Sequence, residues 1–289
     1  MKKLYMFLLA AIICISFVAC KPNTKNAGEF NASNEITVIS REDGSGTRGA
    51  FVELLKIEQK EANGNKKDLT TKEAIVAPKT DVMLSQVAGN DYSIGYVSVG
   101  SLSDKIKAIQ VDGIKATPEN IKNGSYKVAR PFNIATKVEQ NEVTKDFIHF
   151  ILSKEGQEVV AKTYIAVNDK AAAYSGKKPS GKIVVAGSSS VSPIMEKLKE
   201  AYTKVNPNAT IEIQTSDSSS GMKATTDGVC DIGMASRDLK ESEKATLKAT
   251  QIAIDGIAVV VNNNNPITNL SSEAIKNMFT GKTTTWDDL

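Results

Sequence analysis

Apolar residues along this chain follow two alternating patterns. Short β-branched and apolar runs predict strands at residues 35–40, 92–98, 106–111, 182–186, 210–214, 231–235 and 252–261. Segments with apolar residues at helical spacing predict helices at 47–60, 80–88, 142–153, 155–163 and 193–204, with further helix starts at 117 and 217. Polar stretches predict a loop at 61–72 and a linker at 168–182. The alternation predicts an α/β fold with mostly parallel sheets, in which ligands bind at the carboxyl ends of strands.

Two hydroxyl-rich turns stand at such strand ends. Residues 41–47 read Arg-Glu-Asp-Gly-Ser-Gly-Thr, and residues 187–193 read Gly-Ser-Ser-Ser-Val-Ser-Pro. Small residues at a helix start bring backbone N–H groups and hydroxyls to one point, and the helix dipole adds partial positive charge there. Each turn alone is typical of a helix cap. Together with the permanent charge of Arg41, the two turns predict an oxyanion held from two sides.

The N-terminus predicts export. Lys2 and Lys3 precede an apolar run at 4–18, which is typical of a secretory signal peptide spanning residues 1–19. Cys20 directly follows a small residue and resembles the lipid-attachment site of bacterial lipoproteins, although an ordinary cleaved signal remains the alternative. The polar residues of 20–34 then predict a flexible tether. The expected location is the extracytoplasmic face of the cell membrane, with a lipid on Cys20 as the anchor.

Length and composition set the broad class. Removal of the predicted signal leaves 270 residues, enough for two domains, and lowers the formal charge from +3 to +1. A net charge this close to zero gives no reason to expect a nucleic-acid partner. Cys230 is the one cysteine beyond Cys20, so no disulfide framework is expected, and its apolar surroundings predict a small buried side chain.

Enzyme and metal chemistry find little support in the sequence. His149 is the single histidine, and it lies in a segment of helical apolar spacing. One histidine excludes the common histidine-rich zinc sites and makes a serine triad improbable. We therefore expect no enzyme activity, no metal and no cofactor.

Taken together, the motifs resemble the periplasmic phosphate-binding proteins of phosphate ABC transporters. Residues 40–48 and 94–98 are similar to the second half of that family, and residues 187–190, 218–222 and 231–237 to the first half. The resemblance implies the type 2 periplasmic-binding-protein fold, with two lobes, each a mostly parallel sheet flanked by helices, and a cleft between them.

The order of the two halves is reversed relative to the family pattern. The chain ends at Trp-Asp-Asp-Leu (286–289), a motif that the family places before the arginine motif. The resemblance therefore implies a circular permutation in which 168–182 joins the family's two ends. Lobe I is expected at 126–256 and lobe II at 35–125 plus 257–289. A piece of a longer tandem array, or a misassembled gene, is the alternative explanation.

Roles follow from the resemblance residue by residue. Anion contacts are expected from Arg41, Ser45, Gly46, Thr47, Ser189, Ser190, Ser218, Ser219 and Ser236. Asp43 is expected to hold Arg41 in position, and Arg237 is a further supporting residue. Bidentate geometry is the reason why arginine serves this purpose better than lysine.

One departure concerns selectivity. Some family members place an aspartate after the strand at 231–235, where it accepts a proton of phosphate and repels sulfate. Here the segment reads Ala235-Ser236-Arg237-Asp238, so the simple match to a carboxylate fails.

The expected function is capture of inorganic phosphate and its delivery, by a monomeric lipoprotein, to the permease subunits of an ABC importer. Binding of another oxyanion, such as sulfate or molybdate, and a phosphate-sensing surface lipoprotein are the alternatives.

Overall fold

The computed structural model describes residues 30–61 and 66–289. The predicted signal peptide, Cys20 and most of the predicted tether lie outside the described residues. The helices are α1 (Gly46–Leu54), α2 (Thr80–Ala88), α3 (Pro118–Lys122), α4 (Glu142–Leu152), α5 (Lys154–Ala161), α6 (Ser192–Val205), α7 (Ser218–Asp227), α8 (Glu241–Lys244) and α9 (Ser272–Phe279), with 3-10 turns η1 (Val99–Ser101) and η2 (Trp286–Asp288). No helix of this described part is long and apolar enough to cross a membrane.

The strands confirm most of the predicted positions. They are β1 (Thr37–Arg41), β2 (Glu58–Lys60), β3 (Lys66–Asp68), β4 (Ile75–Ala77), β5 (Ser93–Ser98), β6 (Ile106–Ala108), β7 (Gln110–Val111), β8 (Ala129–Thr136), β9 (Ile165–Ala166), β10 (Gly181–Ser188), β11 (Ala209–Ser216), β12 (Ile232–Ala235), β13 (Lys248–Asn262) and β14 (Asn269–Leu270). Small two-stranded sheets join β2 to β3 and β7 to β14.

The helix predicted at 47–60 is too long, and the loop predicted at 61–72 contains a strand. Helix α1 ends at Leu54, because Lys56 adopts a left-handed conformation with φ of 55°. Ile57 is thereby turned into the core, where it is fully buried, and β2 pairs with β3. The apolar residue that suggested a longer helix is therefore a core residue of the following turn.

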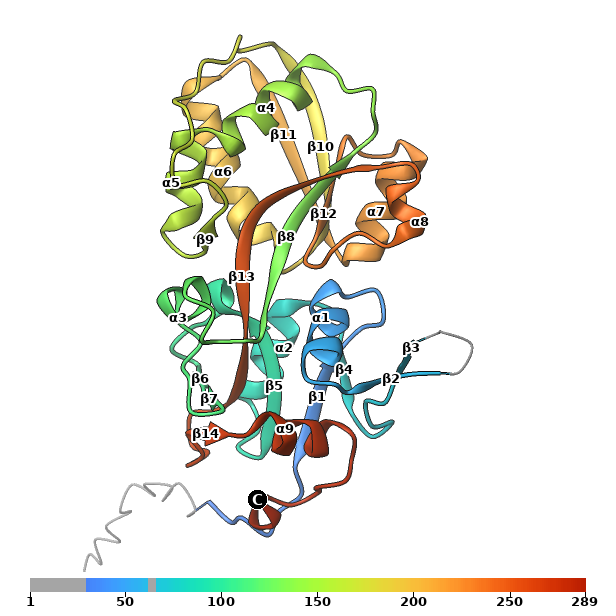
Figure 1. The fold of residues 1–289 in the computed structure, drawn as a ribbon, viewed down its shortest axis with the longest axis vertical. Coiled ribbons are helices and arrows are strands. Elements are labelled where there is room, and N and C mark those ends of the chain that lie inside the picture. Colours follow the sequence, from blue (N-terminus) through green and yellow to red (C-terminus); the bar gives the residue numbers. More distant parts are fainter. Residues whose placement is uncertain (1–29, 62–65) are drawn as a thin grey trace, which may run out of the picture.

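A ten-stranded sheet runs through both lobes (Figure 1), with its main path in the order β11-β10-β12-β8-β13-β5-β1-β4. In the upper lobe, β10 pairs in parallel with β11 and β12, and in the lower lobe β1 pairs in parallel with β4 and β5. Strands β8 and β13 pair with each other and with their neighbours in antiparallel fashion. The predicted parallel strands thus form the body of each lobe, and two long antiparallel strands cross between them.

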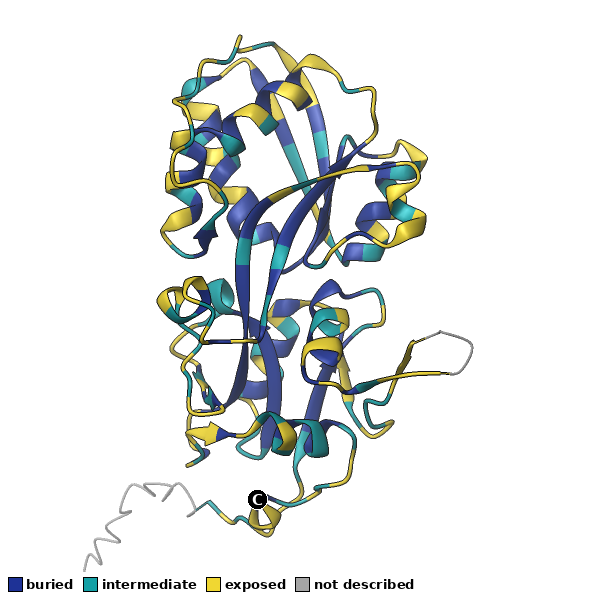
Figure 2. Cartoon of the chain, viewed as in Figure 1, coloured by how far each residue is buried: buried dark blue, intermediate teal, exposed yellow. Residues whose placement is uncertain are grey.

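Buried side chains fall into separate groups in the two lobes (Figure 2). Two clusters in the upper lobe draw on residues 132–253 alone. Two clusters in the lower lobe draw on residues 38–128 and 257–286, together with Ile165. We call the upper part lobe I and the lower part lobe II. Tyr126 and Val128 pack in lobe II, so the chain changes lobe near the start of β8, slightly after the position expected from the sequence.

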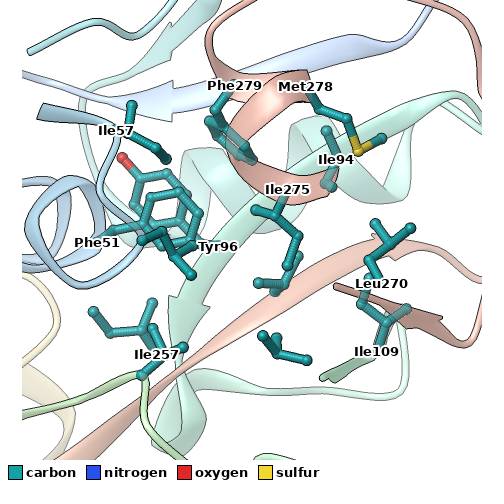
Figure 3. Close-up of a cluster of buried hydrophobic side chains, with 14 of the residues drawn as sticks. Phe51, Ile57, Ile94, Tyr96, Ile109, Ile257, Leu270, Ile275, Met278 and Phe279 are labelled. Atoms are coloured by element: carbon teal, nitrogen blue, oxygen red, sulfur yellow. The ribbon is translucent and has the colours of Figure 1, made fainter. Parts of the chain in front are cut away.

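The C-terminal segment completes the core of lobe II (Figure 3). The ring of Phe279 on α9 lies 4.8 Å from Phe51 and 5.7 Å from Tyr96, measured between ring centroids. Phe51 and Tyr96 are themselves stacked at 3.9 Å. All three side chains are fully buried. Segments from opposite ends of the sequence therefore share one core.

Candidate functional site

The hydroxyl-rich turns meet where the two lobes face each other. Arg41 ends β1 and Thr47 lies in the first turn of α1, both in lobe II, while Ser189 and Ser190 follow β10 in lobe I. Ser218 opens α7, and Ser236 directly follows β12. All six side chains are buried. The parallel strands of each lobe point their carboxyl ends at this interface, which is why motifs far apart in the sequence converge here.

Arg41 links the lobes. Its Nη2 atom donates to Ser189 Oγ at 3.0 Å, and its Nη1 atom donates to Thr80 Oγ1 at 3.2 Å. Its Nε and Nη2 atoms form a bidentate ion pair with Glu42, both at 2.7 Å. The Arg41 side chain is only 3% exposed.

The expected role of Asp43 is wrong. Its carboxylate is 95% exposed and pairs at 2.7 Å with Arg48, on the outer side of the turn. Glu42, the preceding residue, holds Arg41 instead. Adjacent residues of an extended turn point in opposite directions, so the side chain next to β1 reaches the arginine and the following one reaches solvent.

A chain of hydroxyl groups extends from Arg41 across the interface. Thr80 Oγ1 lies 3.4 Å from Ser190 Oγ, which lies 2.8 Å from Thr47 Oγ1. Thr47 Oγ1 also lies 3.3 Å from Ser236 Oγ, which lies 3.4 Å from Ser218 Oγ. Each hydroxyl can donate one hydrogen bond and accept others, so this hydroxyl chain can rearrange around an oxyanion.

Gly46, in the first turn of α1, allows the two lobes to approach each other closely. A Cβ atom on Gly46 would lie 2.5 Å from Ser218 Oγ and 2.8 Å from Ser236 Oγ. Ser45 is buried and caps α1 by accepting the backbone N–H of Arg48 at 3.3 Å. The Ser45 hydroxyl is therefore the N-cap of α1 in the structure.

Ser219 and Arg237 lie at the edge of the hydroxyl chain. The Ser219 N–H donates to the carbonyl of Gly44 at 3.2 Å, another contact between lobes, and its hydroxyl accepts from Arg237 Nη2 at 3.2 Å. Arg237 also forms a bidentate pair with Glu243 at 2.8 Å. Burial opposes ionisation of Glu243, but its hydrogen bond with Arg237 holds the pKa of this carboxyl below its usual value. The Arg237 guanidinium is thus held by lobe I rather than directed at Arg41.

Arg130, on β8, is part of the cluster and was not expected from the sequence. Its Nη1 atom donates to Thr47 Oγ1 at 2.7 Å and to the carbonyl of Ser236 at 2.9 Å. Its Nη2 atom pairs with Asp255 Oδ2 at 2.9 Å. Burial lowers the pKa of Arg130, although Asp255 opposes this effect. A charged residue inside each of two apolar runs, at 128–135 and 252–261, is the sequence signal that could have revealed the pair.

A cavity of about 490 Å³ opens beside the cluster, and Thr80, Ser189 and Ser192 are among the residues that line it. Besides Arg130, Thr80 at the start of α2 is a second residue of the cluster that the sequence did not indicate. Among the described residues, no group of histidine, cysteine and acidic side chains could hold a metal ion. The site therefore offers hydroxyls, backbone amides and guanidinium groups, which is a set of donors suited to an oxyanion.

Comparison with known proteins identifies the family. A family model described as a PBP superfamily domain matches residues 23–155 and 172–289. The phosphate-binding protein PstS 2 of Streptococcus agalactiae is 50% identical over 291 residues, which cover 100% of this chain and 99% of that protein. The chain belongs to the PstS family. The PstS 2 protein of Streptococcus pneumoniae is 45% identical over the full length of both chains.

A solved PstS structure supports the fold. The crystal structure of a phosphate ABC transporter phosphate-binding protein from Streptococcus pneumoniae has a TM-score of 0.69 to this chain at 45% identity, and it covers 88% of this chain and 99% of that one. Other PstS proteins match over shorter stretches. The one from Staphylococcus haemolyticus is 38% identical over 111 residues, which are 36% of this chain and 35% of that protein.

Proposed function

We propose that this PstS family member captures inorganic phosphate between its lobes and delivers it to the permease subunits of an ABC importer. The observation that carries the proposal is the cluster of Arg41 with hydroxyls from both lobes, in a chain that matches phosphate-binding proteins over its full length. A tetrahedral oxyanion needs many donors at short range, and this interface concentrates them in a buried place.

In this proposal Arg41 donates a forked pair of hydrogen bonds to the anion. Thr47 and Ser45 contribute from the start of α1, while Ser189, Ser190 and Ser218 contribute from lobe I. The N-termini of α1 and α7 add backbone N–H groups and a favourable dipole. Because the ligand touches both lobes only when they are in contact, binding shifts the protein toward the closed arrangement, which the permease then recognises.

We propose that a lipid on Cys20 anchors the mature chain to the extracytoplasmic face of the membrane. The basic residues Lys2 and Lys3, the apolar run at 4–18 and the small residue before Cys20 support this assignment. The polar tether of 20–34 then gives the two lobes freedom to reach a permease in the same membrane. We further propose that the binding protein acts as a monomer.

Isothermal titration of the mature domain, residues 21–289, stripped of bound anion, tests the proposal. We expect a tight exothermic response to phosphate, and an equal response to sulfate would show that the site recognises the charge of an oxyanion rather than the proton of phosphate. A response to sulfate or molybdate alone would assign the chain to another oxyanion. No response from a protein that is folded by circular dichroism would overturn the proposed ligand. Phosphate uptake by cells that lack the gene then distinguishes a transport subunit from a sensor.

A further inference from the structure

The loop at residues 42–45 of lobe II rests on the first turn of α7 in lobe I (Figure 1). The backbone N–H of Ser219 donates to the Gly44 carbonyl at 3.2 Å. This hydrogen bond joins the backbones of the two lobes, and it involves neither the Arg41 side chain nor the hydroxyl chain. The lobes are therefore held together here by a contact that needs no anion.

The contact is too close for any side chain at position 44. A Cβ atom on Gly44 would lie 2.2 Å from Asp217 Oδ1 and 2.5 Å from Asp217 Cγ. The Asp217 carboxylate is not free to turn away, because it caps α7 by accepting the backbone N–H of Ser220 at 2.9 Å and also the Ser220 hydroxyl. Gly44 does not have a positive φ, so the approach of α7, and not the backbone conformation of the loop, requires glycine here.

Lobe I holds its side of the contact in place. The Ser219 hydroxyl accepts from Arg237 Nη2 at 3.2 Å, and Arg237 forms a bidentate pair with Glu243 at 2.8 Å. These side chains brace the first turn of α7 from within lobe I. The sequence predicted Ser219 and Arg237 at the anion site, but their contacts in the structure serve the contact between lobes.

Lobe II holds the loop in place from the other side. Asp43 pairs with Arg48 at 2.7 Å, and Arg48 also pairs with Asp68 at 2.8 Å. The Nη1 atom of Arg48 donates to the Arg41 carbonyl at 2.8 Å, just before the loop. The loop and the start of α7 are thus two braced surfaces, so a change in their contact is transmitted to the lobes rather than absorbed locally.

A contact of this kind acts on the closed arrangement as a whole. It exists only while the lobes are together, and it forms after an anion has entered. Loss of one hydrogen bond changes an equilibrium by about two- to tenfold. An anion enclosed by the lobes leaves only when the contact opens, so the contact slows release more than it affects entry.

We propose that Gly44, Asp217 and Ser219 form a latch between the lobes and that this latch sets the rate at which phosphate leaves the site. The inference rests on the proposed function, because it needs an anion enclosed by the lobes. It deepens that function with residues that act on the lobes rather than on the anion. Arg237 is in this proposal a positioning residue, which acts on the latch through Ser219.

Stopped-flow measurement of phosphate release tests the latch in four proteins: the wild type, Gly44→Ala, Asp217→Gly and the double variant. Gly44→Ala is expected to release phosphate at least about fivefold faster, with an association rate within about twofold of the wild type. Asp217→Gly should release phosphate at nearly the wild-type rate, because glycine keeps most of the stability of an N-cap. In the double variant the added methyl group no longer meets a carboxylate, so release should return to within about twofold of the wild type.

Thermal melting of each apo protein checks that it is folded. A purely structural role of Gly44 would give proteins that differ in melting temperature but release phosphate at the same rate, and this result would overturn the inference. A double variant that releases phosphate as fast as Gly44→Ala would overturn it too, because the effect would then not arise from the approach of Asp217. A wild type that binds no phosphate would overturn the proposed function.

A disulfide across the latch gives a second test that does not depend on the folding of Gly44→Ala. A Cβ atom at Gly44 lies 2.5 Å from Asp217 Cγ, which is one bond from Asp217 Cβ, so Gly44→Cys with Asp217→Cys places two thiols within reach of each other. Cys230 is buried and does not compete. The mature domain, residues 21–289, is oxidised with and without phosphate.

The cross-linked protein is expected to hold bound phosphate at least about tenfold longer than its reduced form and to release it when a reductant is added. Release from the cross-linked protein at the rate of the reduced form would overturn the latch. Failure of the disulfide to form in the folded protein would overturn the contact itself. The disulfide does not need an anion, so in a protein that binds no phosphate it still decides whether the loop and α7 meet.

Discussion

Arg41 and Ser189, 148 residues apart in the sequence, form a 3.0 Å hydrogen bond between the two lobes. The groups that join the lobes here are thus the same groups proposed to hold the anion. A ligand that binds these groups only when the lobes are in contact shifts the protein toward the closed arrangement by its difference in affinity for the two arrangements. Ligand affinity and lobe closure are therefore expected to respond to the same substitutions.

Gly46→Ala tests the close approach of the lobes. The added Cβ would lie 2.5 Å from Ser218 Oγ and 2.8 Å from Ser236 Oγ, so the hydroxyls must turn away or the lobes must separate. We expect phosphate affinity to fall at least about tenfold while the apo protein melts at the same temperature or higher, because alanine favours a helix over glycine. Calorimetric titration and thermal melting measure the two effects.

Gly49→Ala is the matched control on the same helix. A Cβ atom there meets nothing within 4 Å. We expect a gain of about 0.5–1 kcal/mol in the free energy of unfolding and unchanged phosphate affinity. Equal loss of affinity in both variants would mean that α1 itself, and not the contact with lobe I, limits binding.

Arg41→Ala tests the central cation. Removal of two or more charge-assisted hydrogen bonds is expected to weaken phosphate binding by about a hundredfold or more. The apo melting temperature should change little, because the partner Glu42 is 20% exposed and can turn to solvent. Lys223→Ala removes the same charge from the surface of α7 and should leave affinity intact. If Arg41→Ala binds phosphate as tightly as the wild type in calorimetry, the assignment of Arg41 to the anion site is wrong.

Part of this site could be predicted from the sequence because the relevant signal is local. Arg41, Thr47 and Ser190 lie in turns that combine a strand end, small residues and a helix start, and that combination is visible in a few residues. Asp43 was misassigned because neighbouring side chains in the turn point in opposite directions, which a motif does not record.

Arg130 and Thr80 could not be predicted because their positions depend on pairing over long distances. Arg130 reaches the site only through its register with Asp255 on β13 and the path of β8 between lobes. The alternation of strands and helices indicated the fold class well. The error at the end of α1 arose because Ile57 continues an apolar pattern after a left-handed turn has ended the helix.

Phe279→Ala tests the contribution of the C-terminal segment to lobe II. This fully buried ring packs on Phe51 and Tyr96, so we expect a loss of about 3–5 kcal/mol in the free energy of unfolding. Urea titration followed by far-ultraviolet circular dichroism and by the fluorescence of Trp286, the single tryptophan, measures it. Leu289→Ala, at a side chain 47% exposed, should cost less than about 0.5 kcal/mol. A similar loss of free energy of unfolding in both variants would contradict the packing of Phe279 in the core of lobe II.

The two ends of the described chain lie together. The N–H of Ile36 donates to the Thr284 carbonyl at 2.7 Å, and the N–H of Asp287 donates to the Ala32 carbonyl at 2.9 Å. The 168–182 segment has no helix and no strand before β10, although Tyr174 is fixed to Asp146 by a 2.5 Å hydrogen bond. These are the conditions under which a chain can be cut in one place and joined in another.

We therefore predict that a rearranged chain folds and binds phosphate. It begins at Lys178, ends at Lys177, and joins Leu289 to Phe30 through a short Gly/Ser linker. Lys177 and Lys178 are exposed, and a cut between them keeps Tyr174 with Asp146. We expect phosphate affinity within about threefold of that of the parent chain, since the site is untouched.

The matched control opens the same joined chain after Leu198, within α6. Leu198 is fully buried, so this cut should prevent folding. Circular dichroism and calorimetric titration of both rearranged chains distinguish the outcomes. If the chain opened at Lys178 is unfolded, the present order of the halves is a requirement of this fold rather than one of two equivalent orders.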